Sequence, residues 1–429
     1  MLPIITGRDG DQITLEVKFD ISGSMLDAEE KILLALNAAG DVVTREALKR
    51  FDADGDPIMM GGVKWYSKGK QPKVYNTPYG VVAVERHVYQ SGQGGATLCP
   101  MEIGARTIRK ATPRFVKMVA HKFAYNAATQ VLEDLEQNHG RPCQKATLQD
   151  LATHVGTVVQ AKEESWSYAT PELGKVRTVG IGVDGTCMLL CDKKWREAMT
   201  GSISLYDKDG ERLHTIYVGA APEYGKETFF NRMKREIDHV KSLYPKALFV
   251  GIADGAKSNW GFLEPYVDEQ VVDFYHVSQY LARAASAVCK NEPEREQWLD
   301  ERCHDLKHKH HAASRILREF EQTAATTTTT KLKPEQKEDL QACITYFSNH
   351  LHQMRYAQYR EKGMPIGSGV TEAACKVLVK QRLCCSGMRW TPEGAQNILS
   401  LRALVLTETR WNQFWQKISQ YGVPQVTIH

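Results

Sequence analysis

The sequence predicts an α/β fold built around a mixed β-sheet, and the evidence lies between residues 176 and 276. Three strand-like runs come first, and Asp207-Lys-Asp209-Gly210 predicts a hairpin turn between the second and the third. Helices and strands then alternate, beginning with a helix over 224–244 whose apolar face consists of Phe229, Phe230, Met233, Ile237 and Val240. Antiparallel strands followed by alternating helices and strands are typical of a mixed sheet covered by helices.

The bulk composition is that of an ordinary globular protein of 429 residues. The apolar fraction of 42% and the charged fraction of 25% are average, and the length suggests about two to four domains. The ten cysteines include no CxxC pair, which favours free thiols in a reducing compartment. The sequence shows neither a signal-like N-terminus nor an apolar run of membrane-spanning length, so we expect a cytoplasmic protein with no membrane partner.

The net charge is only +4, so any affinity for nucleic acid must come from local charge. Residues 351–429 contain ten Lys or Arg against four Asp or Glu. This excess suits a surface that faces phosphates, and an ordinary solvated face explains it equally well.

The first 170 residues predict helices around one β-hairpin. Residues 26–51 have helical periodicity, and residues 72–90 alternate on either side of the turn Thr77-Pro78-Tyr79-Gly80. Helical periodicity returns over residues 101–159, and the part from 147 onward resembles the first helix and turn of a helix-turn-helix. Plain helical hairpins show the same pattern, so a DNA-binding segment and a structural one both stay open.

Residues 278–350 predict a charged helical stretch. Within it, a cysteine and four histidines could hold zinc or could simply line a hydrated basic helix: Cys303, His304, His308, His310 and His311. The five threonines at 326–330 disfavour a helix and predict a loop.

Three acids stand out as candidate metal ligands. Asp184 lies inside the apolar run 176–186, Asp254 ends the run 247–254, and Glu372 follows a glycine-rich turn where a helix begins. A carboxylate in an apolar strand is costly to desolvate unless a cation or a partner compensates. Two aspartates and a glutamate are suitable ligands for the two Mg²⁺ ions of a phosphoryl-transfer enzyme, for which Mn²⁺ can substitute. The alternative is that they are ordinary acids at strand ends.

Two further motifs adjoin these acids. Gly180-Ile-Gly182-Val-Asp184-Gly185 matches the dinucleotide fingerprint, but the chain continues as a strand where that fingerprint requires a helix. Asp273 and His276 lie where the last strand passes into a helix, so they could contact a phosphate, support a metal site or simply start the helix. We therefore expect no dinucleotide site, and we keep the Asp–His pair as a supporting candidate.

Five separated blocks carry a resemblance to a known family. They are Val-Asp-Gly-Thr at 183–186, Ala-Asp-Gly at 253–255, Asp-Phe-Tyr-His at 273–276, Gly-Ser-Gly-Val-Thr-Glu-Ala-Ala-Cys-Lys at 367–376 and Ser-Gly-Met-Arg-Trp at 386–390. Over residues 175–415 the chain resembles the ISKra family of insertion-sequence transposases and, more distantly, the Mutator-like DDE transposases. The resemblance implies an RNase H-like catalytic domain with Asp184, Asp254 and Glu372 as its metal-binding triad, and it gives Asp273 and His276 a supporting role.

The resemblance also suggests how the chain is divided. A helical region at 1–70 and a DNA-binding region at 71–170 precede the first part of the core at 171–288. A helical insertion at 289–355 then separates it from residues 356–429, which complete the core with Glu372 and the C-terminal helices. Such proteins often carry a paired-cysteine zinc module after the N-terminal hairpin, whereas this chain has only Cys99 there, so a zinc-bearing module is unsupported.

The resemblance implies a DNA transposase, which we expect to be associated with the nucleoid. It would bind terminal inverted repeats, cleave DNA with Mg²⁺ and join the freed 3′-hydroxyl to target DNA, and holding two element ends requires at least a dimer. Lys376, Arg382, Arg389 and Trp390 lie close enough to Glu372 in sequence to contact DNA, unless their role is structural. Trp298 could stack on a flipped base or pack in the core. A structure-selective nuclease without strand transfer and a DNA-binding protein without chemistry are the alternatives.

Overall fold

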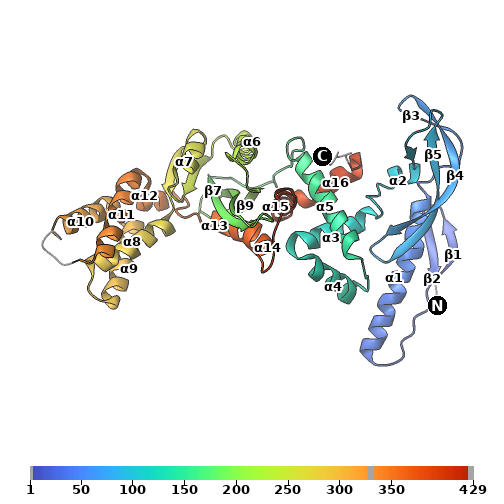
Figure 1. Cartoon of the computed structure of the whole chain (residues 1–429), viewed down its shortest axis with the longest axis horizontal. Coiled ribbons are helices and arrows are strands. Elements are labelled where there is room, and N and C mark those ends of the chain that lie inside the picture. Colours follow the sequence, from blue (N-terminus) through green and yellow to red (C-terminus); the bar gives the residue numbers. More distant parts are fainter. Residues whose placement is uncertain (1–2, 327–331, 424–429) are drawn as a thin grey trace. The chain divides into compact units, whose positions relative to one another are not determined.

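The structure is a computed structural model that describes residues 3–326 and 332–423. The chain divides into two compact units, Met1–Tyr168 together with Arg410–His429, and Ala169–Thr409 (Figure 1). Among the described residues, no helix combines the length and the apolar character that crossing a membrane requires.

The first unit combines two small antiparallel sheets with a set of helices. One sheet pairs β1 with β2, and the other has the order β3-β4-β5-β6. Its elements are β1 (Ile4–Asp9), β2 (Gln12–Glu16), α1 (Met25–Lys49), β3 (Ile58–Met60), β4 (Val63–Asn76), β5 (Val81–Ser91), β6 (Thr97–Leu98), α2 (Pro100–Gly104), α3 (Pro113–Tyr125), α4 (Ala128–His139), α5 (Lys145–Lys162) and α16 (Arg410–Tyr421).

The helix predicted over 26–51 and the hairpin predicted over 72–90 are both confirmed. α1 begins at a capping box, in which Ser24 Oγ accepts from the Asp27 amide and the Asp27 carboxylate accepts from the Ser24 amide. The hairpin turns at Thr77, whose Oγ1 accepts from the amides two and three residues later. Its first strand already begins at Val63, so the predicted boundary between residues 70 and 71 falls inside β4.

A single helix spans residues 147–159, so the turn expected at Gly156 is not formed. α5 continues through Gly156, which is buried together with Leu148, Val155 and Val159, and the helix packs against α3. Apolar residues recur with helical spacing on both sides of the glycine. Their burial outweighs the cost of about 1 kcal/mol that a glycine adds inside a helix.

The last helix belongs to the first unit, which corrects the assignment of residues 356–429 to one segment. On α16, Trp411 lies against His121 with ring centroids 5.6 Å apart, and Phe414 lies against Trp166 at 5.7 Å. Because these aromatic side chains are the apolar face of α16, burying them ties the helix to α3 and to the segment after α5.

The second unit is built on a five-stranded mixed sheet with the order β11-β10-β7-β8-β9. β8 is antiparallel to both β7 and β9, whereas β10 is parallel to both β7 and β11. This is the α/β arrangement that the sequence predicts. The strands and the neighbouring helices are β7 (Thr178–Leu189), β8 (Trp195–Tyr206), β9 (Arg212–Ala220), α6 (Glu227–Leu243), β10 (Leu248–Ala253), α7 (Lys257–Leu263), β11 (Glu269–Val272) and α8 (Phe274–Val288).

Three local predictions in this unit are confirmed. The hairpin turn has Gly210 at a φ of 81°, a conformation that favours glycine, and Asp207 Oδ1 accepts from the amides of residues 209 and 211. β7 continues as a strand through Gly185, where a dinucleotide fingerprint would require a helix. The predicted apolar face of α6 is buried at Phe229, Met233, Ile237 and Val240, and Phe230 is partly buried beside it.

A group of helices, drawn in yellow and orange in Figure 1, separates β11 from the last part of the unit. The described parts of residues 289–355 are mainly helical, as predicted, and their helices pack on α8 and on one another. The helices are α9 (Glu292–His308), α10 (Ala312–Thr326), α11 (Pro334–His350) and α12 (Tyr356–Glu361). In the predicted threonine loop, Thr326 is the last residue of α10, and residues 327–330 lie outside the described residues.

After α12 the chain returns to the sheet. α13 (Gly369–Ala374), a π-helical turn (Cys375–Lys380) and α14 (Gln381–Leu383) follow one another without a break, and α15 (Pro392–Leu406) comes next. A Cβ atom at Gly182 of β7 would overlap the Thr371 side chain, and Thr371 Oγ1 lies 2.8 Å from Ser202 Oγ of β8. The missing side chain at Gly182 therefore lets the helix that carries Glu372 lie directly on β7 and β8.

Candidate functional site

Three aspartates occupy aligned positions on three neighbouring parallel strands. Asp184 lies within β7, and Asp254 and Asp273 directly follow β10 and β11. Gly182 of β7 pairs with Ile252 of β10, and the same register carried two residues further places Asp184 beside Asp254. Ala253 of β10 pairs with Val272 of β11, so the next position places Asp254 beside Asp273. Neighbouring strands lie about 4.8 Å apart, and the carboxyl ends of parallel strands are the usual ligand site of an open α/β sheet. The sheet thus gathers three acids at one edge.

Asp184 is half-buried and held by two donors. Its Oδ1 accepts from the Gly185 amide at 2.7 Å, and its Oδ2 accepts from the Cys375 thiol at 3.3 Å. Thr200 Oγ1 lies 2.9 Å from the same sulfur. Burial raises the pKa of the Cys375 thiol to about 12, so the thiol stays protonated and can donate.

Asp254 begins the loop after β10. Its Oδ1 accepts from the Ala256 amide at 3.0 Å, and its carbonyl oxygen accepts from the Tyr346 hydroxyl of α11 at 2.8 Å. The helical insertion therefore contacts the strand end that carries this acid. Such a contact fixes the backbone and leaves the second carboxylate oxygen available for a ligand.

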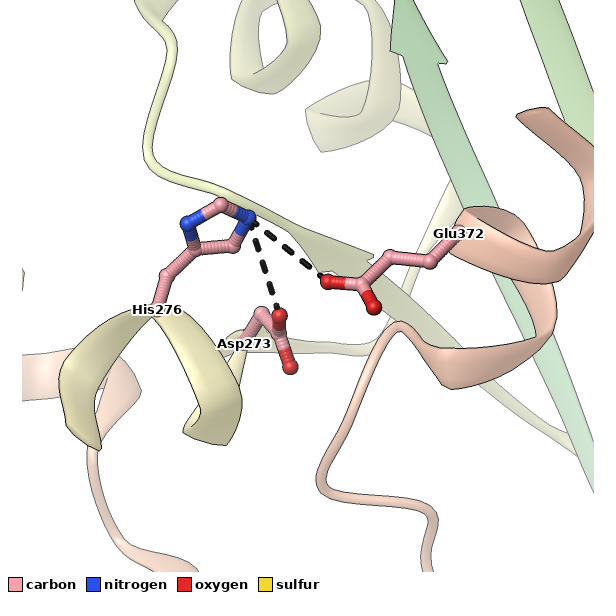
Figure 2. Close-up of side chains that lie close together, drawn as sticks. All are labelled: Asp273, His276 and Glu372. Carbon is pink, nitrogen blue, oxygen red and sulfur yellow. Dashed lines mark ion pairs between the residues drawn. The ribbon is translucent and has the colours of Figure 1, made fainter. Parts of the chain in front are cut away.

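Asp273, His276 and Glu372 converge from two helices (Figure 2). Asp273 caps α8 and is fully buried, with its two oxygens accepting from the Ser368 amide and hydroxyl at 2.9 Å each. One turn into α8, His276 Nε2 lies 3.9 Å from both Asp273 Oδ2 and Glu372 Oε1. Ser368 begins the turn before Glu372, so the buried aspartate attaches the start of α13 to the sheet.

Burial raises the pKa of both Asp184 and Glu372. At Asp184, donors from Cys375 and Gly185 oppose the rise and repulsion from Asp254 adds to it. At Glu372, repulsion from Asp273 adds to the effect of burial, while His276 opposes it. The site therefore holds carboxylates whose ionised forms are unfavourable, and a bound cation would stabilise them.

Among the described residues, one group of three candidate ligands has its ligand atoms within 4.8 Å of one another, namely Asp273, His276 and Glu372. The predicted triad of Asp184, Asp254 and Glu372 does not form such a group, although the three acids lie around the same sheet edge. Glu372 instead lies beside the imidazole of His276, with its Oε1 atom 3.9 Å from Nε2.

The structure divides the predicted DNA-contacting residues into exposed and buried ones. Lys376 and Arg389 are exposed and Trp390 is half-buried. Arg382 is only 2% exposed, and its guanidinium lies 5.1 Å from the Trp390 ring centroid. Trp298 is 8% exposed, and its ring centroid lies 5.9 Å from that of Phe320 in the insertion core. Arg382 and Trp298 therefore have packing roles here, which corrects their prediction as DNA contacts.

Three of the four histidines at 304–311 have partners other than a shared metal position. His304 and His308 stack with ring centroids 4.5 Å apart, and His308 Nε2 lies 2.9 Å from an Arg360 nitrogen. His310 pairs with Glu361 at 2.8 Å. A hydrated basic helix accounts for these contacts.

No protein-family model and no curated protein matches this chain. The case for a function therefore rests on the residues themselves.

The predicted site lacks two groups that the structure places at Asp184, the Cys375 thiol and the Thr200 hydroxyl. No sequence signal marks these contacts, because Thr200 and Cys375 are 175 positions apart in the chain and Cys375 and Asp184 are 191 positions apart. Asp273 could have been ranked higher from sequence, since it ends an apolar strand in the same manner as Asp254.

Proposed function

We propose that this chain is a DDE-type DNA transposase of the ISKra kind, with an RNase H-like fold in its second unit. The observation that carries the proposal is the register of β7 and β10, which sets Asp184 beside Asp254 at the edge where α13 brings Glu372. Two strand-borne aspartates and one helix-borne glutamate around a sheet edge are what two-metal phosphoryl transfer requires of a protein.

The donor chemistry of the site fits Mg²⁺. Asp184, Asp254 and Glu372 offer carboxylate oxygens, the ligands that hard cations prefer, and Mn²⁺ can occupy the same positions. Bound ions would lower the pKa of the attacking water or 3′-hydroxyl and stabilise the leaving oxygen. The raised pKa values of Asp184 and Glu372 support this assignment, because burial, with a smaller contribution from neighbouring acids, disfavours the ionised carboxylates and a bound cation would stabilise them.

The surrounding residues position these ligands. Cys375 and the Gly185 amide orient the Asp184 carboxylate, and Asp273 attaches the start of α13 through Ser368. His276 lies between Asp273 and Glu372, where it can orient the glutamate or donate a hydrogen bond to a phosphate oxygen. In this scheme water cleaves the phosphodiester at an element end, and the freed 3′-hydroxyl then attacks target DNA. Because two ends must be held together, at least a dimer would act.

A structure-selective nuclease is the second candidate, because it would use the same acids for hydrolysis without strand transfer. A DNA-binding protein without chemistry is less well supported, since all three acids of the triad are present.

The test uses labelled DNA from the two ends of the element that encodes the chain, incubated with Mg²⁺. We expect nicking at the ends and a joined product from the wild type, and neither from Asp254→Asn. Asp209→Asn is the matched control, because Asp209 lies in an exposed turn of the same unit. Nicking without joined product would favour the nuclease, and DNA binding without any metal-dependent cleavage would refute the enzyme.

A further inference from the structure

A basic surface lies on the helical insertion. It is formed where α9 ends, α10 begins and α12 passes, and we define it by Lys307, His308, His310, Arg315 and Arg360. Arg360 Nη1 lies 2.9 Å from His308 Nε2, and Arg315 Nη1 donates to the His310 carbonyl at 2.8 Å. These contacts bring Arg360 of α12 to the end of α9 and Arg315 of α10 to the turn between α9 and α10.

The positive charge of this basic surface is only partly compensated. Two acids adjoin it, and each already pairs with a cation: Asp305 with Lys309 at 2.6 Å and Glu361 with His310 at 2.8 Å. Within residues 3–326 and 332–423, Lys307, Arg315 and Arg360 form no ion pair within 4.0 Å, although Arg315 lies near enough to Asp305 to help lower the pKa of that carboxyl. They therefore remain available to an external anion.

The basic surface begins next to the candidate site. Lys307 Nζ lies 4.5 Å from the ring centroid of Phe274, and Phe274 directly follows the buried acid Asp273. α12, which carries Arg360, ends seven residues before Ser368, the hydroxyl partner of Asp273. Cationic side chains thus continue from the edge of the acidic site onto the insertion.

We propose that this basic surface binds the phosphate backbone of the DNA duplex next to the bond that is cleaved, an inference that rests on the proposed function. The acids at the sheet edge repel phosphates, so a substrate needs attraction from a neighbouring surface, and Lys307, Arg315 and Arg360 supply it. Arginine also matches the geometry of a phosphate with two parallel donors. Trp298, the aromatic residue predicted to stack on a base, is buried, so the surface would position DNA by its phosphates without reading its sequence.

The experiment compares two charge reversals of equal size within the insertion. Arg315→Glu with Arg360→Glu changes the basic surface, and Lys333→Glu with Lys337→Glu changes two exposed lysines at the start of α11. Affinity of the full-length protein for a labelled duplex of about 30 base pairs is measured by fluorescence anisotropy between about 50 and 300 mM NaCl. Melting curves test whether both variants fold. If the charge reversal on the basic surface does not fold, Arg315→Gln with Arg360→Gln takes its place.

A plot of log affinity against log salt has a negative slope, and each lost phosphate contact makes it shallower by about 0.9. The slope of the surface variant should therefore be shallower by about 2, and its affinity should be roughly 10- to 100-fold weaker than that of the wild type. The control should bind like the wild type. Equal affinity of the two variants for the duplex would refute the basic surface as a DNA-binding site, and tighter binding of duplex RNA would refute DNA as its partner. Asp254→Asn separates the two proposals. If the proposed function is right, this variant binds DNA normally and does not cleave it, whereas a wild type that binds through the surface and never cleaves would refute only the function.

Discussion

Gly182→Ala should destabilise the second unit and disturb the candidate site, because β7 and α13 touch at this point. The new methyl group would overlap Thr371 Oγ1 and lie 3.0 Å from Thr371 Cβ. Moving Thr371 also breaks its 2.8 Å hydrogen bond with Ser202, which is buried. Overlap in a packed core costs about 1–3 kcal/mol of folding free energy, and the lost hydrogen bond costs about 1 kcal/mol. Replacing glycine by alanine also lowers the conformational entropy of the unfolded chain, which stabilises the fold by about 0.4–1 kcal/mol.

The net cost is therefore about 1–3 kcal/mol, and it should lower the melting temperature of the second unit by about 2–12 °C. Circular dichroism or intrinsic fluorescence measures the shift, and the end-cleavage assay should show a matching loss, because α13 carries Glu372. Gly369→Ala is the control, since a Cβ atom there meets nothing within 4 Å. Adding Thr371→Ala removes the overlapping oxygen and should restore part of the stability. A Gly182→Ala protein that melts and cleaves like the control would refute the reasoning.

Three further predictions concern Asp184. Cys375→Ala removes a donor to its carboxylate and should lower cleavage roughly 10-fold or more, whereas Cys375→Ser keeps a donor and should retain most of the rate; equal losses in both would contradict a positioning role. Mg²⁺ at about 100 times its Kd should raise the melting temperature of the second unit by about 5–10 °C in the wild type but far less in Asp184→Asn, and an equal rise in both would argue against Asp184 as a ligand. Because burial holds the folded-state pKa of Asp184 above its unfolded value, its contribution to stability is fully present below the unfolded pKa and is lost as pH rises through the folded one. In EDTA, urea unfolding between about pH 4 and 7 should therefore show stability falling with pH, and a slope unchanged in Asp184→Asn would contradict this.

Local patterns in the sequence predicted local structure well. The α1 helix, the β4–β5 hairpin, the turn at Asp207 and the apolar face of α6 all follow from short-range periodicity and turn chemistry. The mixed sheet also follows, because a hairpin constrains neighbours to be antiparallel and a helical crossover constrains them to be parallel. The turn expected at Gly156 is absent because tertiary packing buries this glycine and α5 continues through it.

The sequence by itself determined which acids end or interrupt apolar strands, since that property belongs to each segment alone. Only the tertiary structure decided which of them meet. The register of three parallel strands sets Asp184, Asp254 and Asp273 side by side, and the missing Cβ of Gly182 admits the helix of Glu372. Burial decided between the roles that the sequence left open for Arg382 and Trp298, because both side chains lie in the core, where packing outweighs their polar groups. Contacts between distant residues depend on how the elements pack, which no local pattern specifies.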